Sequence, residues 1–550
     1  MFSNFVCGDT KCSGLLLFTT KDDKNKKQIK IMSENSRLHA VMVPFPLQGC
    51  ITPHLQLAQH LISSYDFFVT FVNTTYNHER LMGLQAAETR QLESSSRIKF
   101  VHVPDGLPED VNRGADLARF RAAMLALEPV FVDLFQQLLN ESPVTCIIRD
   151  VYMPSAHKPA TKLGIPVVGF STMSAVTLWC LDHVETYFAE GLLPLPAPPD
   201  HQLAKSLQQA QIDEEAAMRE HPITCVPGVP PFVKVKHLPS AFLDNDVAVI
   251  KHFTQFQNPL MHECDLVLLN TFEELEALVL EAMQAKGFNV CPVGPLLFSP
   301  SFNVDSAAAA NSFISQTSST LWLEDETSLV WLDQQKPSTV TFVSFGSIAT
   351  MSIEQIWELA CGLEMSNQPF LWVIRPDLIR QEDSESHAQF LTSFSSFVEH
   401  IKGQALMVPW VPQMKVLSHP SISAFLTHCG WNSTLESISS GVPMLGWPFF
   451  SDQILNCEYI TQVWKIGVDF ERRPSGGLIL REEISRKVRA MHEEVHEVNL
   501  FRTRAKELQK LAQRTHTKGG SSQMNMATFV EHIGAHLEAE DSVQGIGCSQ

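Results

Sequence analysis

Short apolar runs alternate with segments of helical spacing along most of this chain, and that order limits the folds open to it. In the first half, turns and helical patterns separate apolar runs at residues 39–44, 67–73, 98–103, 144–149 and 167–170. Strands that alternate with helices pair in parallel and bury both faces of their sheet. The pattern therefore predicts an α/β fold with a mostly parallel sheet and helices on both sides.

Two helices of this half are predicted from local signals. Thr52 and Pro53 are a good N-cap and first helical residue, because a proline needs no N–H at that position. Residues 116–140 form a long amphipathic pattern, either one helix or a pair around Pro129. The first half is expected to close near the apolar run at residues 266–270.

A second α/β half follows a change in composition. Residues 298–328 are rich in Ser, Ala and Asn with little periodicity, which is typical of a linker between domains. Beyond the linker, apolar runs recur at residues 339–345, 370–374, 405–408, 422–426 and 443–447. Two helical patterns close the chain, at residues 481–509 and 519–537. For 550 residues, two domains of this class are expected.

The composition restricts the partners. Lys and Arg number 41 against 60 Asp and Glu, and this formal charge of −19 argues against sequence-independent binding of nucleic acid or of an anionic membrane surface. No apolar run reaches transmembrane length and the 12 cysteines form no CxxC pair, so we expect a cytoplasmic protein with reduced thiols. Neither half carries G-x-G-x-x-G or a Walker sequence, which argues against a nicotinamide or ATP enzyme.

The densest functional pattern lies in residues 410–453. Its apolar run ends at Thr427-His428-Cys429-Gly430, and Asn432 or Ser433 is a good N-cap for the helical pattern that follows. A strand-to-helix turn with a glycine presents backbone N–H groups and the positive end of the helix dipole to an anion. The turn is therefore suited to a diphosphate.

Residues 410–453 resemble the signature box of plant family 1 UDP-glycosyltransferases. The resemblance implies a GT-B fold, in which two Rossmann-like domains face each other across a cleft. It also implies a UDP-sugar donor, a small lipophilic acceptor, no metal or other cofactor, and a monomer; Gln at position 453 favours glucose as the sugar. The implied donor-binding residues are Trp410 at the uracil with Val411 beside it, Gln413 and Glu436 at the ribose, Ser347, His428, Asn432 and Ser433 at the diphosphate, and Trp431, Asp452 and Gln453 at the hexose.

The resemblance also suggests domain boundaries. Residues 1–37 are an N-terminal extension that we expect to be disordered, and residues 38–297 form the acceptor-binding domain. Residues 298–328 are the linker, and residues 329–505 form the UDP-sugar-binding domain. Residues 506–550 are a helix that returns to the first domain, followed by a tail. The helical pattern at residues 481–509 is expected to pack on the first domain as well.

The expected catalytic base is replaced in this chain. In the family the first strand runs into a Pro-x-Pro-x-Gln-Gly-His turn whose histidine takes the acceptor proton, whereas this chain reads Pro44-Phe-Pro-Leu-Gln-Gly-Cys50. The family's Asp beside that histidine is matched by Asp150. A thiol of pKa ~8.5 is mostly protonated at pH 7, and a neighbouring carboxylate raises its pKa further. Cys50 is therefore a poor base.

Three interpretations stay open. In the first, the acceptor is a phenol or carboxylic acid that needs no base beyond Asp150. In the second, His54, one helical turn after Cys50, acts as the base instead. A solvated position on the helix is the simpler interpretation of His54. In the third, the protein binds donor or acceptor without efficient transfer. The first functional hypothesis is therefore a UDP-glucose-dependent transferase. It is favoured because all the residues implied at the hexose, Asp452 and Gln453 among them, are present. The second is a catalytically weak or inactive nucleotide-sugar-binding module, which Cys50 favours.

The acceptor site is poorly specified. Its candidate apolar walls are Phe131, Phe135, Met173 and Trp179, although such residues at helical spacing are more often core. No residue in the chain selects one acceptor.

Overall fold

The computed structural model describes residues 37–546 apart from residues 85–96, 109–110, 112, 114–116, 197–204, 244–246, 299–320, 381–383, 471–476 and 494. The predicted extension, except Arg37, and most of the predicted linker lie outside the described residues. The described residues from Leu38 onward form one compact unit. The proposed domain boundaries within that unit stay predictions.

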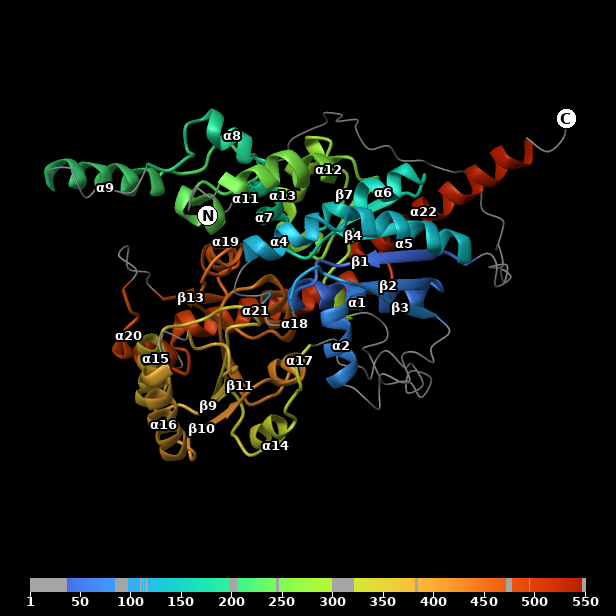
Figure 1. Cartoon of the computed structure of the whole chain (residues 1–550). Helices are drawn as coiled ribbons and strands as arrows, with labels where there is room; N and C mark the ends of the chain where they lie inside the picture. Colours follow the sequence, from blue (N-terminus) through green and yellow to red (C-terminus); the bar gives the residue numbers. More distant parts are fainter. Residues whose placement is uncertain are drawn as a thin grey trace, which may run out of the picture. The chain divides into compact units, whose positions relative to one another are not determined.

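The first half forms a seven-stranded sheet in which every pair of neighbouring strands is parallel (Figure 1). All residues of its central strands β1 and β4 are buried, as expected for strands covered on both faces. The first half was expected to close near residues 266–270, and its sheet continues for one more short strand, β7, beside β6. The strand order is β3 (Ile98–Val103), β2 (Phe68–Thr74), β1 (His39–Val43), β4 (Cys146–Asp150), β5 (Val167–Ser171), β6 (Leu266–Leu269) and β7 (Val290–Pro292).

The second half forms a six-stranded parallel sheet. Successive strands are added on one side of β8 up to β10, and from β11 onward on its other side, so the strand order switches direction between β8 and β11. In folds of this kind, ligands bind at such a switch point, outside the carboxyl ends of the strands. The edge strand β13 is three residues long and carries no pattern that could have predicted it. The order is β10 (Ala405–Val408), β9 (Phe370–Val373), β8 (Val340–Ser344), β11 (Ile422–Thr427), β12 (Met444–Gly446) and β13 (Gly467–Asp469).

Helices connect the strands in both halves. Those of the first half are α1 (Gln48–Tyr65), α2 (Thr75–Leu84), α4 (Leu117–Leu125), α5 (Glu128–Glu141), α6 (His157–Lys162), α7 (Ala175–Asp182), α8 (Val184–Ala189), α9 (Lys205–Arg219), α10 (Ser240–Leu243), α11 (Val247–His252), α12 (Asn258–His262) and α13 (Glu273–Ala285). Those of the second half and the C-terminus are α14 (Thr327–Asp333), α15 (Ile353–Met365), α16 (Ser384–His400), α17 (Gln413–Leu417), α18 (Trp431–Ser440), α19 (Gln453–Glu458), α20 (Arg481–Ala490), α21 (His496–Thr515) and α22 (Ser521–Ile546). Short 3₁₀ or π segments are η2 (Pro154–Ala156), η3 (Val235–His237), η4 (Phe253–Gln257), η5 (Leu296–Phe298) and η8 (Tyr459–Val463).

Helix α1 begins earlier than predicted. It starts at Gln48 after an extended N-cap residue, Leu47, and Pro53 lies inside it. Thr52 is not the N-cap, because its hydroxyl oxygen accepts a hydrogen bond from Gln48 Nε2 at 2.6 Å within the first turns. Since proline has no N–H, the carbonyl of Gly49 is left without its helical donor.

The C-terminal helices pack on different halves of the chain. Arg481 N at the start of α20 donates to Glu358 Oε2 on α15 at 2.7 Å, and Gln509 Nε2 on α21 donates to Ser439 O on α18 at 3.1 Å. Residues 481–509 therefore pack on the second half, and the prediction that they return to the first half is wrong. Helix α22 reaches the first sheet, where Asn525 Nδ2 donates to Pro292 O in β7 at 2.9 Å.

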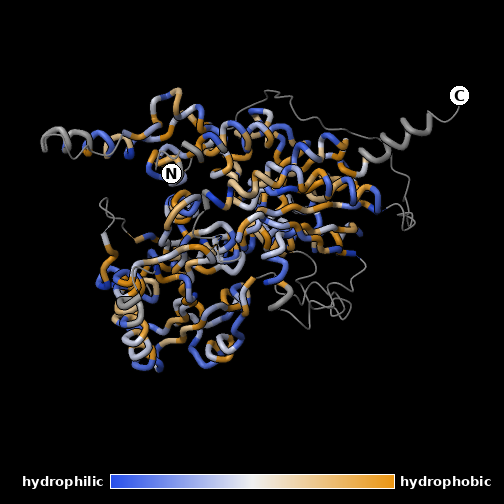
Figure 2. The backbone as a smooth tube through the Cα atoms, in the orientation of Figure 1, coloured by the Kyte–Doolittle hydropathy of each residue, from blue (hydrophilic) through white to orange (hydrophobic). Residues whose placement is uncertain are grey.

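Hydrophobic residues are distributed through both halves and alternate with hydrophilic ones along the chain (Figure 2). Among the described residues, no single helix is both long and apolar enough to cross a membrane. One bent pair, Arg119–Leu125 with Glu128–Glu141, meets the length and composition requirement only when the two helices are taken together.

Candidate donor and catalytic site

His428 lies in a slot between two glycines at the switch point of the second sheet. Gly346 follows β8 within two residues, and His428 directly follows the neighbouring strand β11. A Cβ atom on Gly346 would lie 2.5 Å from His428 Nε2, and one on Gly430 would lie 2.4 Å from it. Burial, followed by the positive charge of Arg375, lowers the pKa of His428 to about 4. The imidazole is therefore neutral and can donate one hydrogen bond.

Helix α18 starts directly after this slot, at Trp431. Its N-cap is Gly430, with no side-chain capping bond, so the prediction of Asn432 or Ser433 as N-cap is wrong. The reason is that Cys429 turns the chain with a left-handed φ of 63°, which brings the helix start two residues forward. Asn432 and Ser433 thus lie in the first turn, where their side chains bond elsewhere.

The predicted ribose residues lie together beside that first turn. Gln413 Nε2 donates to Ser433 Oγ at 2.8 Å and to Glu436 Oε2 at 2.5 Å. Burial is the main cause that raises the pKa of Glu436 to about 7. Trp410 is half-buried and precedes the buried Val411 at the start of this group.

The predicted hexose residues are already engaged by protein groups. Trp431 is buried, and its Nε1 donates to Asn270 O in the first half at 2.8 Å. Asp452 Oδ2 accepts from Asn456 Nδ2 at 2.8 Å, while burial raises the pKa of Asp452 to about 6. Gln453 Oε1 accepts from Phe449 N at 2.8 Å, which leaves the amide nitrogen as the group that can contact a sugar.

Sequence reasoning missed the residue that holds the Gly346–Ser347 turn. Arg375 is buried, donates to Gly346 O, and donates to Ala349 O at 2.7 Å. Its Nε donates to Asp377 Oδ1 at 3.0 Å. Its position after the apolar run of β9, at the carboxyl end of a parallel strand, was the signal that could have identified it. Ser347 itself is half-buried within this turn.

The predicted catalytic turn, residues 44–50, meets helix α18, which carries the predicted diphosphate residues Asn432 and Ser433. Asn432 Nδ2 in α18 donates to Gly49 O in α1 at 2.8 Å. The acceptor is the carbonyl that Pro53 leaves without a helical donor. Cys50 follows Gly49, so residues 383 positions apart in the chain bring the predicted diphosphate and catalytic groups together.

Cys50 in the first turn of α1 and Asp150, the last residue of β4, are neighbours. Burial and then the negative charge of Asp150 raise the pKa of the Cys50 thiol well above its ordinary value. Thr172 Oγ1 donates to Cys50 Sγ at 3.4 Å, and Tyr152 N donates to Asp150 Oδ1 at 2.8 Å. Burial raises the pKa of Asp150 to about 6. At neutral pH the thiol is therefore protonated beside a largely ionised carboxylate.

His54 is fully buried, whereas the simpler interpretation predicted a solvated side chain. Its Nδ1 lies 2.8 Å from Cys50 O and therefore donates to that carbonyl, and 3.9 Å from Asp150 Oδ2. Burial lowers the pKa of His54 to about 3, and its ring packs edge-on against Phe170. A ring with no exposed surface has no access to an acceptor hydroxyl, so its burial argues against the predicted role as substitute base.

The comparisons with known proteins agree with this geometry. Residues 327–478 match the family model described as UDP-glucoronosyl and UDP-glucosyl transferase. UDP-glycosyltransferase 85A1 of Arabidopsis thaliana is 36% identical over 520 residues, which cover 93% of this chain and 99% of that protein. The chain belongs to the plant family 1 UDP-glycosyltransferases. Linamarin synthase 1 of Manihot esculenta is 35% identical over 90% of this UDP-glycosyltransferase and 96% of its own length.

Solved structures confirm the predicted GT-B fold of this UDP-glycosyltransferase. A Phytolacca americana protein in complex with UDP-2fluoro-glucose and pterostilbene superposes with a TM-score of 0.69 at 26% identity, over 90% of this chain and 99% of that one. A UDP-glucosyltransferase from Polygonum tinctorium superposes with a TM-score of 0.70 at 27% identity, over 92% and 100% of the two chains. The enzyme class, a glycosyltransferase that uses UDP-sugars, is thereby confirmed as well.

Aromatic side chains lie close to the predicted catalytic turn of this UDP-glycosyltransferase. Phe131, Phe135 and Trp179 are buried in the core. The Phe45 ring instead lies next to those of Phe120 and Tyr152, with centroids 5.5 and 6.0 Å apart. The predicted wall residue Met173 contributes through its sulfur, 3.9 Å from the Tyr152 hydroxyl.

Metal ligands are not grouped in the part of the chain that the structure describes: no three His, Cys, Asp or Glu side chains there could share an ion. The residues predicted to hold the diphosphate supply an amide, hydroxyls and a neutral imidazole beside the N-terminus of α18. Groups of this kind bind a diphosphate through hydrogen bonds and the helix dipole.

Proposed function

We propose that this UDP-glycosyltransferase moves glucose from UDP-glucose to an acidic hydroxyl or carboxyl group of a small lipophilic acceptor, with inversion at the anomeric carbon. The acceptor oxygen attacks that carbon, the bond to the diphosphate oxygen breaks, and UDP leaves. The observation that carries the proposal is the Asn432–Gly49 hydrogen bond of 2.8 Å, because it supports placing the diphosphate site against the turn of Cys50.

The donor roles are proposed residue by residue. Trp410 stacks on the uracil, and the Gln413–Glu436 pair binds the ribose hydroxyls. The neutral imidazole of His428 and the amides at the start of α18 bind the diphosphate, supported by the glycine slot and the helix dipole. Asp452 and Gln453 bind the hexose. Trp431 has its N–H on Asn270 O, so its contribution is to orient this end of α18.

The proposed preference for acidic acceptors follows from Cys50. Its raised pKa means that the thiol cannot accept a proton at neutral pH, and Asp150 behind it has no exposed surface. An alcohol of high pKa would have to lose its proton without a positioned base, which typically costs about 100- to 10,000-fold in rate. A carboxylic acid is already ionised at pH 7, and a phenol of pKa about 10 gives up its proton far more readily than an aliphatic alcohol. Support comes from a 32% identical relative that is named 7-deoxyloganetic acid glucosyltransferase.

The test is acceptor-dependent release of UDP from UDP-glucose, measured on a graded panel of carboxylic acids, phenols and aliphatic alcohols of similar size. The proposal predicts turnover that falls steeply as the pKa of the acceptor rises. Equal turnover across the panel would overturn the preference. UDP binding with no release from any acceptor would instead support the nucleotide-sugar-binding module, which the protonated thiol of Cys50 favours.

A further inference from the structure

Residues 321–325, which we call the strap, are fixed to the proposed donor site at both ends. Leu321 N donates to Gln48 Oε1 at 2.6 Å, and Asp325 N donates to Trp410 O at 2.9 Å. Gln48 is the first residue of α1 and belongs to the catalytic turn. The strap therefore connects that turn with the backbone of the residue proposed to bind the base.

The side chain of Trp322 lies directly on the indole of Trp410. Their ring centroids are 5.5 Å apart and the ring planes are inclined by 21°. A base held between two rings needs them about 7 Å apart, twice the normal carbon–carbon contact of about 3.5 Å. The two indoles are thus in direct contact, and a base stacks on the opposite face of Trp410 as long as Trp322 stays in place.

Two cations hold Trp322 where it is. The guanidinium carbon of Arg80 lies 5.2 Å from the Trp322 ring centroid, and that of Arg375 lies 6.0 Å from it. Both distances are within the range of cation–π attraction. Because Arg80 belongs to the first half and Arg375 to the second, the ring is fixed from both.

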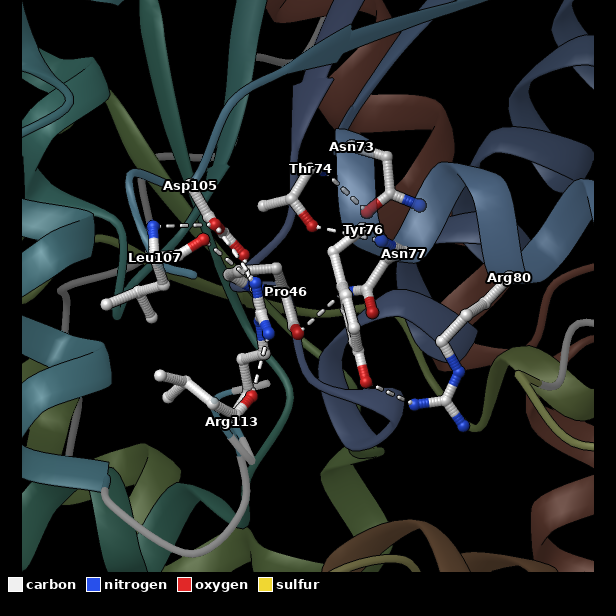
Figure 3. A network of polar contacts seen from close by, with 10 residues as sticks. Pro46, Asn73, Thr74, Tyr76, Asn77, Arg80, Asp105, Leu107 and Arg113 are labelled. Atoms are coloured by element: carbon white, nitrogen blue, oxygen red, sulfur yellow. Dashed lines mark hydrogen bonds and ion pairs between the residues drawn. The ribbon is translucent and has the colours of Figure 1, made fainter. Parts of the chain in front are cut away.

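The position of Arg80 is supported by a further network (Figure 3). Its Nη1 donates to the Tyr76 hydroxyl at 3.2 Å, and the guanidinium of Arg113 lies 3.9 Å from the centre of the Tyr76 ring. Arg113 is buried and its Nε donates to Asp105 Oδ2 at 3.1 Å. Figure 3 shows Tyr76 between the two arginines, so the contacts to Trp322 begin in a fixed part of the first half.

We propose that Trp322 is a positioning residue for donor binding, which backs the indole of Trp410 and presents its other face to the uracil at a fixed angle. A plate that is already ordered loses less conformational entropy when the base binds, so affinity rises. The inference rests on the proposed function, because it requires that Trp410 stacks on the base. It assigns to residues 321–325, read from sequence as linker, a role in the affinity for UDP.

Calorimetric titration of UDP into the full-length protein tests this inference. Trp322→Leu removes the aromatic face and keeps apolar bulk, and we expect it to weaken UDP binding about three- to tenfold, on the scale of one aromatic pair. Trp322→Phe keeps a ring and should stay within about twofold of the wild type. The matched control is Trp357→Leu, since that half-buried indole on α15 packs on Phe390, Phe394 and Phe397 away from the strap.

The double variant Trp322→Leu/Trp410→Ala separates positioning from a merely structural effect. Because Trp322 acts through Trp410, the double variant should bind UDP no more weakly than Trp410→Ala alone. Additive losses would overturn the inference, and so would unchanged binding in Trp322→Leu. Tighter binding in that variant would also overturn it, since Trp322 would then occupy the place of the base.

Two further readouts separate failure of the inference from other failures. If Trp410→Ala binds UDP as well as the wild type, the proposed donor site fails and not only the role of Trp322. If Trp322→Leu is unfolded in a thermal melt, Arg80→Gln tests the position of Trp322 by removing the cation–π contact to its ring. That variant should weaken UDP binding about twofold to fivefold, and unchanged binding would overturn the inference.

Discussion

Pro53 leaves the carbonyl oxygen of Gly49 without a helical N–H, and Asn432 Nδ2 takes that place at 2.8 Å. A proline inside a helix is usually a defect, but here it frees an acceptor at the point where the two halves of the chain meet. The first turn of α1 and the first turn of α18 are joined by this bond. The proposed diphosphate site and the turn of Cys50 therefore depend on the same local geometry.

Asn432→Ala should weaken both stability and donor binding. The substitution removes the hydrogen bond to Gly49 O, which we expect to lower the free energy of unfolding by about 1 kcal/mol in urea denaturation. UDP affinity should fall as well, because a donor at the start of α18 is lost. Asn432→Asp should be worse for UDP than alanine, since a carboxylate cannot donate and repels phosphate. An Asp variant that binds UDP like the wild type would contradict the proposed role.

Gly430→Ala should displace His428 from its slot. The new Cβ would lie 2.4 Å from His428 Nε2, too close for a non-bonded contact, so the imidazole has to move. The φ of Gly430 is −61°, which alanine adopts without strain, so the effect reports on the slot alone. We expect UDP binding to weaken by about tenfold or more, measured by titration. Gly403→Ala is the control, because nothing lies within 4 Å of its Cβ position; an equal effect in both variants would contradict the slot.

Much of the fold could be predicted because each strand is a local apolar run. The runs at residues 98–103 and 405–408 coincide with β3 and β10, whereas β7 and β13 are too short for any period to be detected. The start of α18 was misplaced for a different reason. Sequence rules assign the cap to a polar side chain, while here the left-handed Cys429 ends the turn and Gly430 caps the helix by backbone alone.

The site was predicted only where its residues belong to one motif. Gln413, Ser433 and Glu436 lie within one box and do meet in the structure. Trp322 could not be assigned, because its contacts join segments that are far apart in the chain. For Arg375 the sequence offered only its place just after the apolar run of β9, and not its bond to Gly346 O. Likewise, the full burial of His54 depends on how α1 packs against β5, which helical spacing alone does not reveal.

Glu436→Gln should flatten the pH dependence of stability. The pKa of Glu436 in the folded protein is about 7, above its ordinary 4.5, so between these values the folded protein keeps a proton that the unfolded chain has lost. The contribution of the Glu436 carboxyl to the free energy of unfolding is fully present below pH 4.5 and is lost as the pH rises through 7. Between pH 5 and pH 8 we expect this loss to be on the order of 1 kcal/mol or more. Urea denaturation across this range should show a smaller decline for Glu436→Gln than for the wild type. Glu399→Gln, whose side chain is 72% exposed, should decline like the wild type, and equal declines in all three proteins would refute the assignment.

Cys50→His tests the central claim, that sugar transfer takes place at the Cys50 turn and is limited there by the missing base. The measurement is kcat/KM for UDP-glucose transfer to an aliphatic alcohol and to a carboxylic acid of similar size, in the wild type, Cys50→His and Cys50→Ser. We predict that the histidine raises kcat/KM for the alcohol by about 100-fold or more and changes it little for the acid, while the serine changes neither. A histidine variant with no gain on the alcohol, or with the same gain on both acceptors, would contradict the account.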